Sequence, residues 1–280
     1  PHHIRVPRNL RHMKSLTSQL VEVFSAIQGE GLNVGTRQIF VRFALCDLRC
    51  YFCDSAHTWK IPKDCQIERT PGLRDFETHL NPVSLEDLLH WVERQNQPGL
   101  HDSISLTGGE PLLHSPFLTE FLPRVRDSTG LPIYLETAGH RPQNVDPILP
   151  YLDVVGMDIK LPSVSGETWW TEHAEFLQRC DRAHLEVFVK IIISDRTRPE
   201  ELEIASQLVA KVNPQIPVFL QPVTPLSASL KASNEALRTD KLIDSIEPLP
   251  EQVLSWQTLM KTQLKQVRVI PQTHKMLGQL

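Results

Sequence analysis

Short β-branched or aromatic runs alternate with longer amphipathic runs from Leu20 onward, and this alternation limits the possible folds more than any other feature. It is typical of β-α units around a parallel sheet. The predicted strands are 21–27, 38–45, 103–107, 133–137, 154–160, 186–193, 218–223 and 267–271. The predicted helices are 84–95, 115–128, 168–180, 199–212, 235–246 and 251–265. We therefore expect an α/β fold.

The helix predicted over 84–95 has the clearest local signals. Ser84 can cap its first turn, and Leu85, Leu88 and Val92 share one face. No fixed short repeat and no long low-complexity linker interrupts the 280 residues, so we expect one domain over 13–280. Residues 1–12 look like a tag and are set apart from the fold.

Composition excludes several classes of function. No run of about 18 apolar residues could span a bilayer, so no membrane is expected. The formal charge of -4 provides no basic surface for nucleic acid. Five cysteines, an odd number, do not form the framework of a small secreted protein and fit a reducing cytoplasm.

Polar residues follow four predicted strands, at the point where each strand ends. They are the stretches 107–110 (Thr-Gly-Gly-Glu), 136–139 (Glu-Thr-Ala-Gly), 158–160 (Asp-Ile-Lys) and 221–222 (Gln-Pro). In parallel α/β folds this edge of the sheet is where binding sites form. We expect the four stretches to share one pocket.

Three cysteines occur within eight positions, directly after an apolar strand. Cys46, Cys50 and Cys53 follow the spacing C-x3-C-x2-C. Thiolates bind iron-sulfur clusters and structural zinc, and both usually require four ligands. Three thiolates on a 4Fe-4S cluster would leave one iron open for an exchangeable ligand. The alternative is a zinc site completed by Cys65 or His57; otherwise Cys65 and Cys180 are ordinary thiols.

The motif, with Phe52 before its last cysteine and Gly108-Gly109-Glu110 downstream, resembles the radical S-adenosylmethionine superfamily. Six further segments are similar to the 7-carboxy-7-deazaguanine synthase family, over about Val21 to Leu280. They are "SAIQGEGLNVGTRQIFVRFALC", "CDSAHTW", "LTGGEPLL", "LETAG", "FLQPV" and "QTHKMLGQL".

This resemblance implies a single modified partial (β/α) barrel of the radical SAM type. It implies conversion of 6-carboxy-5,6,7,8-tetrahydropterin to 7-carboxy-7-deazaguanine with loss of ammonia, on the route to queuosine. The implied cofactors are a 4Fe-4S cluster on the three cysteines, S-adenosylmethionine on the open iron, and magnesium. A glycyl-radical activase and a non-catalytic zinc or iron-sulfur module are the alternatives.

The resemblance also implies which residues bind the substrate. Glu30 would accept hydrogen bonds from the guanidine-like edge of the pterin, and Arg42 would bind its carboxylate. The tail would fold over the site so that the carboxylate of Leu280 touches the substrate. The full implied set is Ile27, Gln28, Gly29, Glu30, Arg42, Thr107, His274 and Leu280. The alternatives are a glycine-rich turn, a salt-bridged strand arginine and a frayed tail.

A second implied set binds S-adenosylmethionine. It comprises Phe52, Cys53, Asp54, Gly109, Glu110, Asp158, Ile159, Lys160, Gln221, Pro222, Val223 and Thr224. Three of these depart from the family pattern, which has Ser-Pro where this chain has Asp158-Ile159 and an acid in place of Thr224. Ser55 would bind magnesium, although Asp54 and Ser55 could instead cap the following helix.

The implied partners are a small pterin, an electron donor such as flavodoxin or ferredoxin, and a second copy in a homodimer. The connection 60–83 is longer than usual, and the sequence does not decide between a lid and a partner-binding insertion.

Overall fold

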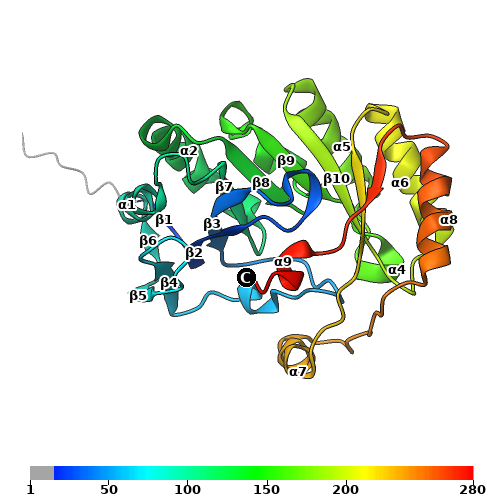
Figure 1. Ribbon diagram of the computed structural model, residues 1–280, viewed down its shortest axis with the longest axis horizontal. Helices are drawn as coiled ribbons and strands as arrows, with labels where there is room; N and C mark the ends of the chain where they lie inside the picture. Colours follow the sequence, from blue (N-terminus) through cyan, green and yellow to red (C-terminus); the bar gives the residue numbers. More distant parts are fainter. Residues whose placement is uncertain (1–15, 280) are drawn as a thin grey trace, which may run out of the picture.

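The computed structural model describes residues 16–279, which build a ten-stranded sheet in the order β12-β11-β10-β9-β8-β7-β3-β2-β4-β5 (Figure 1). The predictions for residues 1–12 and for Leu280 therefore lie outside the described residues. A separate small sheet pairs β1 (Thr17–Ser18) with β6 (Val83–Ser84). The strands of the large sheet are β2 (Leu20–Ile27), β3 (Arg37–Phe43), β4 (Asp64–Glu68), β5 (Phe76–Leu80), β7 (Ser103–Gly108), β8 (Ile133–Thr137), β9 (Val154–Asp158), β10 (Glu186–Ile193), β11 (Val218–Pro222) and β12 (Val267–Val269).

All neighbouring pairs from β3 to β12 run parallel, which confirms the predicted parallel sheet. The first long strand differs, because β2 is antiparallel to β3. Only residues 28–36 connect the two, with the short 3-10 helix η1 (Gly31–Asn33). That connection is too short for the crossover that parallel neighbours require.

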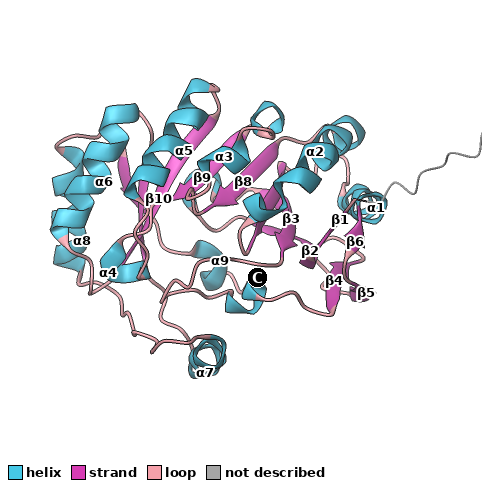
Figure 2. Ribbon diagram, turned by 180° about the vertical axis from the view of Figure 1, so that it is seen from behind, coloured by secondary structure: helices cyan, strands magenta, loops and turns pink. Residues whose placement is uncertain are grey.

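Helices cover the outer side of the curved sheet, and α9 lies on the other side (Figures 1 and 2). In the predicted helix 84–95, Ser84 caps the first turn by accepting the Asp87 amide at 3.1 Å, as expected. The α-helices are α1 (Leu85–Gln95), α2 (Ser115–Thr129), α3 (Pro142–Val145), α4 (Pro162–Ser165), α5 (Trp170–Arg182), α6 (Pro199–Val212), α7 (Ala228–Leu237), α8 (Pro250–Lys261) and α9 (Thr273–Met276). The remaining 3-10 helices are η2 (Ala56–Trp59), η3 (Pro111–His114) and η4 (Leu149–Tyr151).

The helix predicted over 235–246 is wrong in position. The chain is helical earlier, in α7, which Ser227 caps by accepting the Leu230 amide at 3.3 Å. Tertiary contacts fix it there, because the buried Asn234 donates to the Cys53 carbonyl at 2.7 Å. Arg238 ends the helix and lies over the Tyr51 ring at 4.9 Å.

One large apolar core lies between the sheet and the outer helices. Cys65 of β4 and Cys180 of α5 are both fully buried in it, as ordinary apolar-packed thiols. Cys65 therefore cannot complete a zinc site with the cysteine motif. None of the described helices has the length and apolarity that a membrane span requires.

The connection 60–83 extends the large sheet. Its two strands add beyond β2, because β4 pairs parallel with β2 and antiparallel with β5. Phe76 of β5 packs against the stacked rings of Phe24 and Phe40. The connection thus forms the far edge of the large sheet.

Candidate active site at the ends of the parallel strands

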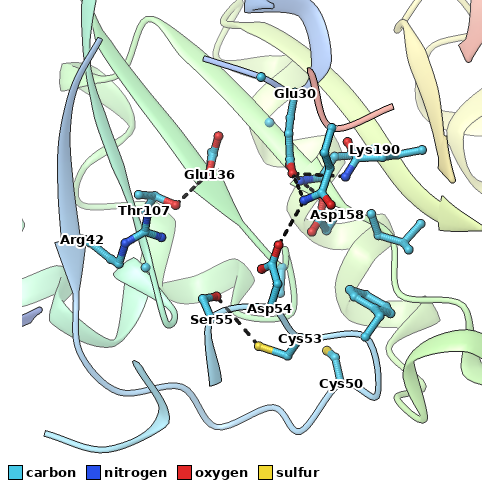
Figure 3. Close-up of a pocket in the computed structure, with 18 of the residues that line it drawn as sticks. Glu30, Arg42, Cys50, Cys53, Asp54, Ser55, Thr107, Glu136, Asp158 and Lys190 are labelled. Atoms are coloured by element: carbon cyan, nitrogen blue, oxygen red, sulfur yellow. Dashed lines mark hydrogen bonds and ion pairs between the residues drawn. The ribbon is translucent and has the colours of Figure 1, made fainter. Parts of the chain in front are cut away.

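A cavity of about 410 Å³ lies at the carboxyl ends of the parallel strands (Figure 3). The loop after β3 and the segment 272–279 (hereafter the tail) close it. Thr107, Glu136, Asp158 and Gln221 all line it from four different strands. This confirms that the polar strand ends share one pocket.

Most of the predicted site residues line this cavity, from both predicted sets. They are Ile27, Gln28, Gly29, Glu30, Arg42, Cys46, Cys50, Phe52, Cys53, Asp54, Ser55, Thr107, Gly109, Asp158, Lys160, Gln221, Val223, Thr224 and His274. Glu110, Ile159 and Pro222 are not among the lining residues, and Leu280 lies outside the described part of the chain.

The three motif cysteines line one side of the cavity with free thiols. Burial raises the pKa of Cys46 and Cys53, and it raises that of Cys50 to about 12. Within residues 16–279, no three His, Cys, Asp or Glu side chains are grouped to hold one metal ion. In an iron-sulfur cluster each cysteine binds a different iron. The three thiols therefore fit a cluster better than a single ion.

Gly108 and Gly109 join β7 to the start of the cysteine loop. A Cβ on Gly108 (φ 122°) would lie 2.3 Å from the Phe43 carbonyl oxygen, and one on Gly109 would lie 1.9 Å from that of Leu45. The amide of Gly109 donates to the Phe43 carbonyl at 3.0 Å. At both glycines the chain thus packs so closely against itself that a side chain would not fit.

Glu110 stabilises the same turn through hydrogen bonds. Its carboxylate accepts hydrogen bonds from the Leu112 amide at 3.0 Å, the Thr137 hydroxyl at 2.8 Å and the Ala138 amide at 3.0 Å. The residue is only 1% exposed. Its contacts tie η3 to the end of β8, and its contact with S-adenosylmethionine stays a prediction.

A largely buried ion network lies opposite the cysteines. Lys190 of β10 pairs with Glu30, and with Asp158 at 3.2 Å; Lys160 contacts Asp158 at 2.8 Å (Figure 3). Burial by itself raises the pKa of Glu30, but the Lys190 ammonium outweighs it and leaves that pKa below its usual value. Burial lowers the pKa of Lys190, whereas Asp158 and Glu30 raise it well above its usual value. Glu30 is thus held as a carboxylate.

Glu136 of β8 is a second glutamate on the same cavity, and its surroundings differ. Its carboxyl group accepts from the Gln28 amide at 2.8 Å and the Thr107 hydroxyl at 2.7 Å. Burial raises its pKa, and Lys190 opposes this without reversing it, while the Glu30 charge adds to the rise. Glu136 therefore favours its neutral form more than Glu30 does.

Arg42 and Ser55 keep polar groups for a ligand. The Nε of Arg42 donates to Glu22 at 2.6 Å, and the guanidinium lies over the Phe24 ring at 5.5 Å. The alternative of a salt-bridged arginine thus applies to the Nε of Arg42, which Glu22 occupies. Ser55 precedes η2 without making a side-chain cap, and its hydroxyl lies 3.9 Å from the Cys53 thiol. The capping alternative for Ser55 is therefore wrong.

The tail folds onto the cavity, as predicted. The Thr273 amide donates to the Gly29 carbonyl at 3.0 Å, and Lys275 contacts Asp54 at 2.6 Å. The side-chain amide of Gln272 donates to the Glu30 carboxylate at 2.7 Å and to the Asp54 carboxylate at 3.2 Å. Asp54 is thus occupied by the tail and does not cap η2.

The sequence placed Glu136 in the shared pocket without naming a role for it, and it gave no role to Lys190, Gln272 or Lys275, although all four line the cavity. For Lys190 there was a signal, because a lysine inside the apolar run "EVFVKIII" must be buried with a partner or exposed. For Gln272 and Lys275 the only signal was their place in the tail segment "QTHKMLGQL", since their partners lie more than 200 positions away.

Comparisons with known proteins agree with this geometry. Residues 41–193 match the family described as the Radical SAM superfamily. The chain is 42% identical to a 7-carboxy-7-deazaguanine synthase of Geobacter sulfurreducens over 94% of this chain and 98% of that protein. The chain belongs to the 7-carboxy-7-deazaguanine synthase family. A synthase of the same name from Methanocaldococcus jannaschii is 28% identical over 92% of the chain and 99% of that protein.

The fold agrees with that membership. QueE from Escherichia coli superposes with a TM-score of 0.53, at 21% identity, over 88% of this chain and all of that one. SuiB from Streptococcus suis gives a TM-score of 0.51 at 11% identity, over 81% of this chain and 47% of that one. The partial-barrel prediction is confirmed, and these relatives do not favour the activase alternative.

Proposed function

We propose that the chain is a radical SAM lyase that converts 6-carboxy-5,6,7,8-tetrahydropterin to 7-carboxy-7-deazaguanine. The observation that carries this is 42% identity to a synthase of that product over nearly the whole chain. The cavity supports it, because the three motif thiols and the Glu30 carboxylate line the same space. A cluster and a polar heterocycle could thus lie side by side.

The three thiols of Cys46, Cys50 and Cys53 would hold a 4Fe-4S cluster, with S-adenosylmethionine beside it. When bound, these groups supply the radical that removes hydrogen from the substrate. Lys160 would contribute positive charge next to the cluster, since its ammonium lies 5.3 Å from the centre of the Phe52 ring on the cavity wall. Ser55 would bind magnesium through its hydroxyl, together with substrate oxygens and water.

Glu30 would read the guanidine-like edge of the pterin. A carboxylate facing two N–H donors makes the stronger, charge-assisted type of hydrogen bond. In the protein alone, the amides of Gln221 and Gln272 occupy one Glu30 oxygen at 3.1 and 2.7 Å. The N–H donors of the substrate would therefore replace these two side-chain amides as the hydrogen-bond partners of Glu30.

Arg42 would bind the substrate carboxylate from the opposite wall. Its Nε is used by Glu22, and within the described part of the chain no other nitrogen of the guanidinium donates a hydrogen bond. Those nitrogens can form the paired contacts that suit a carboxylate. Thr107, Gln28 and His274 would complete the substrate contacts.

The remaining expectations are proposals of the same kind. The enzyme would act as one domain over 13–280, as a homodimer in the cytoplasm, and receive its electron from a flavodoxin or ferredoxin. Free thiols at all five cysteines suit such a reducing compartment.

The test is an anaerobic incubation of the reconstituted protein with S-adenosylmethionine, reductant, magnesium and 6-carboxytetrahydropterin. Mass spectrometry should detect 7-carboxy-7-deazaguanine from the wild type and none from Cys50→Ala. Cys65→Ala is the matched control, because that thiol lies in the core away from the cavity. 5'-Deoxyadenosine without deazaguanine would mean a different substrate, and the absence of both would refute the enzyme assignment.

A further inference from the structure

The loop between β4 and β5, residues 69–75, contacts the tail. The Arg74 guanidinium donates to the carbonyl of Gly278 at 2.8 Å, although the two residues are 204 positions apart. The connection 60–83, whose purpose the sequence did not decide, therefore reaches the segment that closes the cavity. Nothing in the proposed reaction yet accounts for this contact.

The loop is held so that it can carry a fixed side chain. The Glu68 carboxylate, in a residue only 1% exposed, accepts hydrogen bonds from the amides of Ser25 and Arg74, both at 2.8 Å. Asp75 accepts from the Thr70 amide at 2.8 Å and from the Thr70 hydroxyl at 2.9 Å. Both ends of the loop are thus tied by carboxylates, one of them buried.

Arg74 has a backbone conformation that favours glycine. Its φ is 56°, in the left-handed region that residues with a Cβ rarely adopt. Strained positions of this kind point to a side chain that is needed where it stands. Here that side chain is a guanidinium with a partner in the tail.

The tail has separate anchors for its two halves. Gln272, Thr273 and Lys275 bind Glu30, the Gly29 carbonyl and Asp54. Beyond α9, the amides of residues 277–279 bond only within the tail. Among hydrogen bonds of the described residues, the one from Arg74 is the contact that ties 277–279 to the rest of the protein.

We propose that Arg74 is a positioning residue that fixes residues 277–279 at the rim of the cavity. Its consequence for substrate affinity rests on the function proposed above. Gln279 lines the cavity, so release of this half of the tail would open the rim on the substrate side. The connection 60–83 is then a support for the tail.

The variant Arg74→Gly separates this role from a structural one. Glycine relieves the backbone strain, so the melting temperature should stay level or rise. Loss of the guanidinium should speed hydrogen exchange in a peptide covering 277–279 by about fivefold, the factor that corresponds to about 1 kcal/mol. Arg69→Ala is the control, because Arg69 is 61% exposed and pairs with Glu77 at 3.0 Å in the same hairpin.

Exchange that is unchanged in Arg74→Gly would overturn the proposal, and this readout needs no substrate. In turnover, KM for 6-carboxytetrahydropterin should rise about fivefold with kcat within about twofold of wild type, and Arg74→Lys should restore part of the loss. Faster exchange with an unchanged KM would overturn the substrate-affinity role. A wild-type protein that makes no deazaguanine would contradict the proposed function, while the exchange result would still decide whether Arg74 holds the tail.

Discussion

Two largely buried glutamates face the same cavity, and their immediate contacts distinguish them (Figure 3). Glu30 is paired with the Lys190 ammonium, and its pKa lies below the usual value in spite of burial. Glu136 is bonded to an amide and a hydroxyl, and burial raises its pKa. Identical side chains thus have pKa values shifted in opposite directions, because one has a direct cationic partner.

This difference assigns distinct roles within one site. A carboxylate fixed by an ammonium can accept two N–H donors of a heterocycle, whereas a carboxyl group that favours its proton can also donate. The protein therefore presents an acceptor at Glu30, which Lys190 of β10 fixes, and an acceptor that can become a donor at Glu136 of β8. Such asymmetry suits an unsymmetrical substrate.

The largest expected effect, on the free energy of unfolding, comes from removing the Lys190 ammonium that distinguishes Glu30 from Glu136. Lys190→Met leaves Glu30 without its ammonium and leaves Asp158 with Lys160 alone. Breaking a buried ion pair on one side costs about 3–5 kcal/mol, and we expect a loss of that size in the free energy of unfolding. Urea denaturation of the apoprotein measures it. A loss below about 1 kcal/mol would mean that the network contributes little.

Removing the Glu30 charge should cost less. In Glu30→Gln, Lys190 keeps Asp158, and the amide oxygen can still accept from Gln221 and Gln272. We expect a loss of about 1–3 kcal/mol. The Glu30 pKa is lowered on folding, so its stabilisation is full above the unfolded value near 4.5 and disappears as pH falls through the folded pKa. The difference in the free energy of unfolding between wild type and Glu30→Gln should therefore grow as pH rises towards 4.5. A difference that does not change with pH would contradict the lowered pKa of Glu30.

The smallest effect is expected for Glu136→Gln, at about 1 kcal/mol or less, because neutral donors surround the group. The pH dependence has the opposite sign. Since the folded pKa of Glu136 is raised, the folded wild type binds more protons and loses stability as pH rises from 4.5 through that pKa. Relative to wild type, the variant should gain stability over this range, as unfolding curves at several pH values would show. Parallel curves would mean that folding leaves the pKa of Glu136 unchanged, and would contradict the raised value.

The parallel sheet was predictable from the sequence because local periodicity fixes strands such as β8 and β10, and because strand ends of parallel strands meet at one edge. The cysteine loop followed from a motif. Strands β4 and β5 were missed, since polar, half-exposed runs such as "FETHL" carry little apolar alternation. The position of α7 depended on the Asn234 contact with Cys53, which no local pattern contains.

Within the site, the sequence predicted the residues that belong to motifs and missed those that act through long-range partners. Glu30 was assigned from its segment, but the charge on it depends on Lys190, 160 positions away. Arg74 had no signal at all, because its left-handed backbone and its partner Gly278 exist only in the folded chain.

The most direct test of the account is the rate of 7-carboxy-7-deazaguanine formation against substrate concentration for wild type and Glu30→Gln. We expect product from the wild type and a KM at least about tenfold higher in the variant, since a charge-assisted hydrogen bond contributes about 1.5–3 kcal/mol. The kcat should change little if Glu30 has the proposed role, because a contact to the guanidine-like edge would bind the substrate and the transition state alike. An unchanged KM, or a cluster-loaded wild type that makes no deazaguanine, would contradict the account.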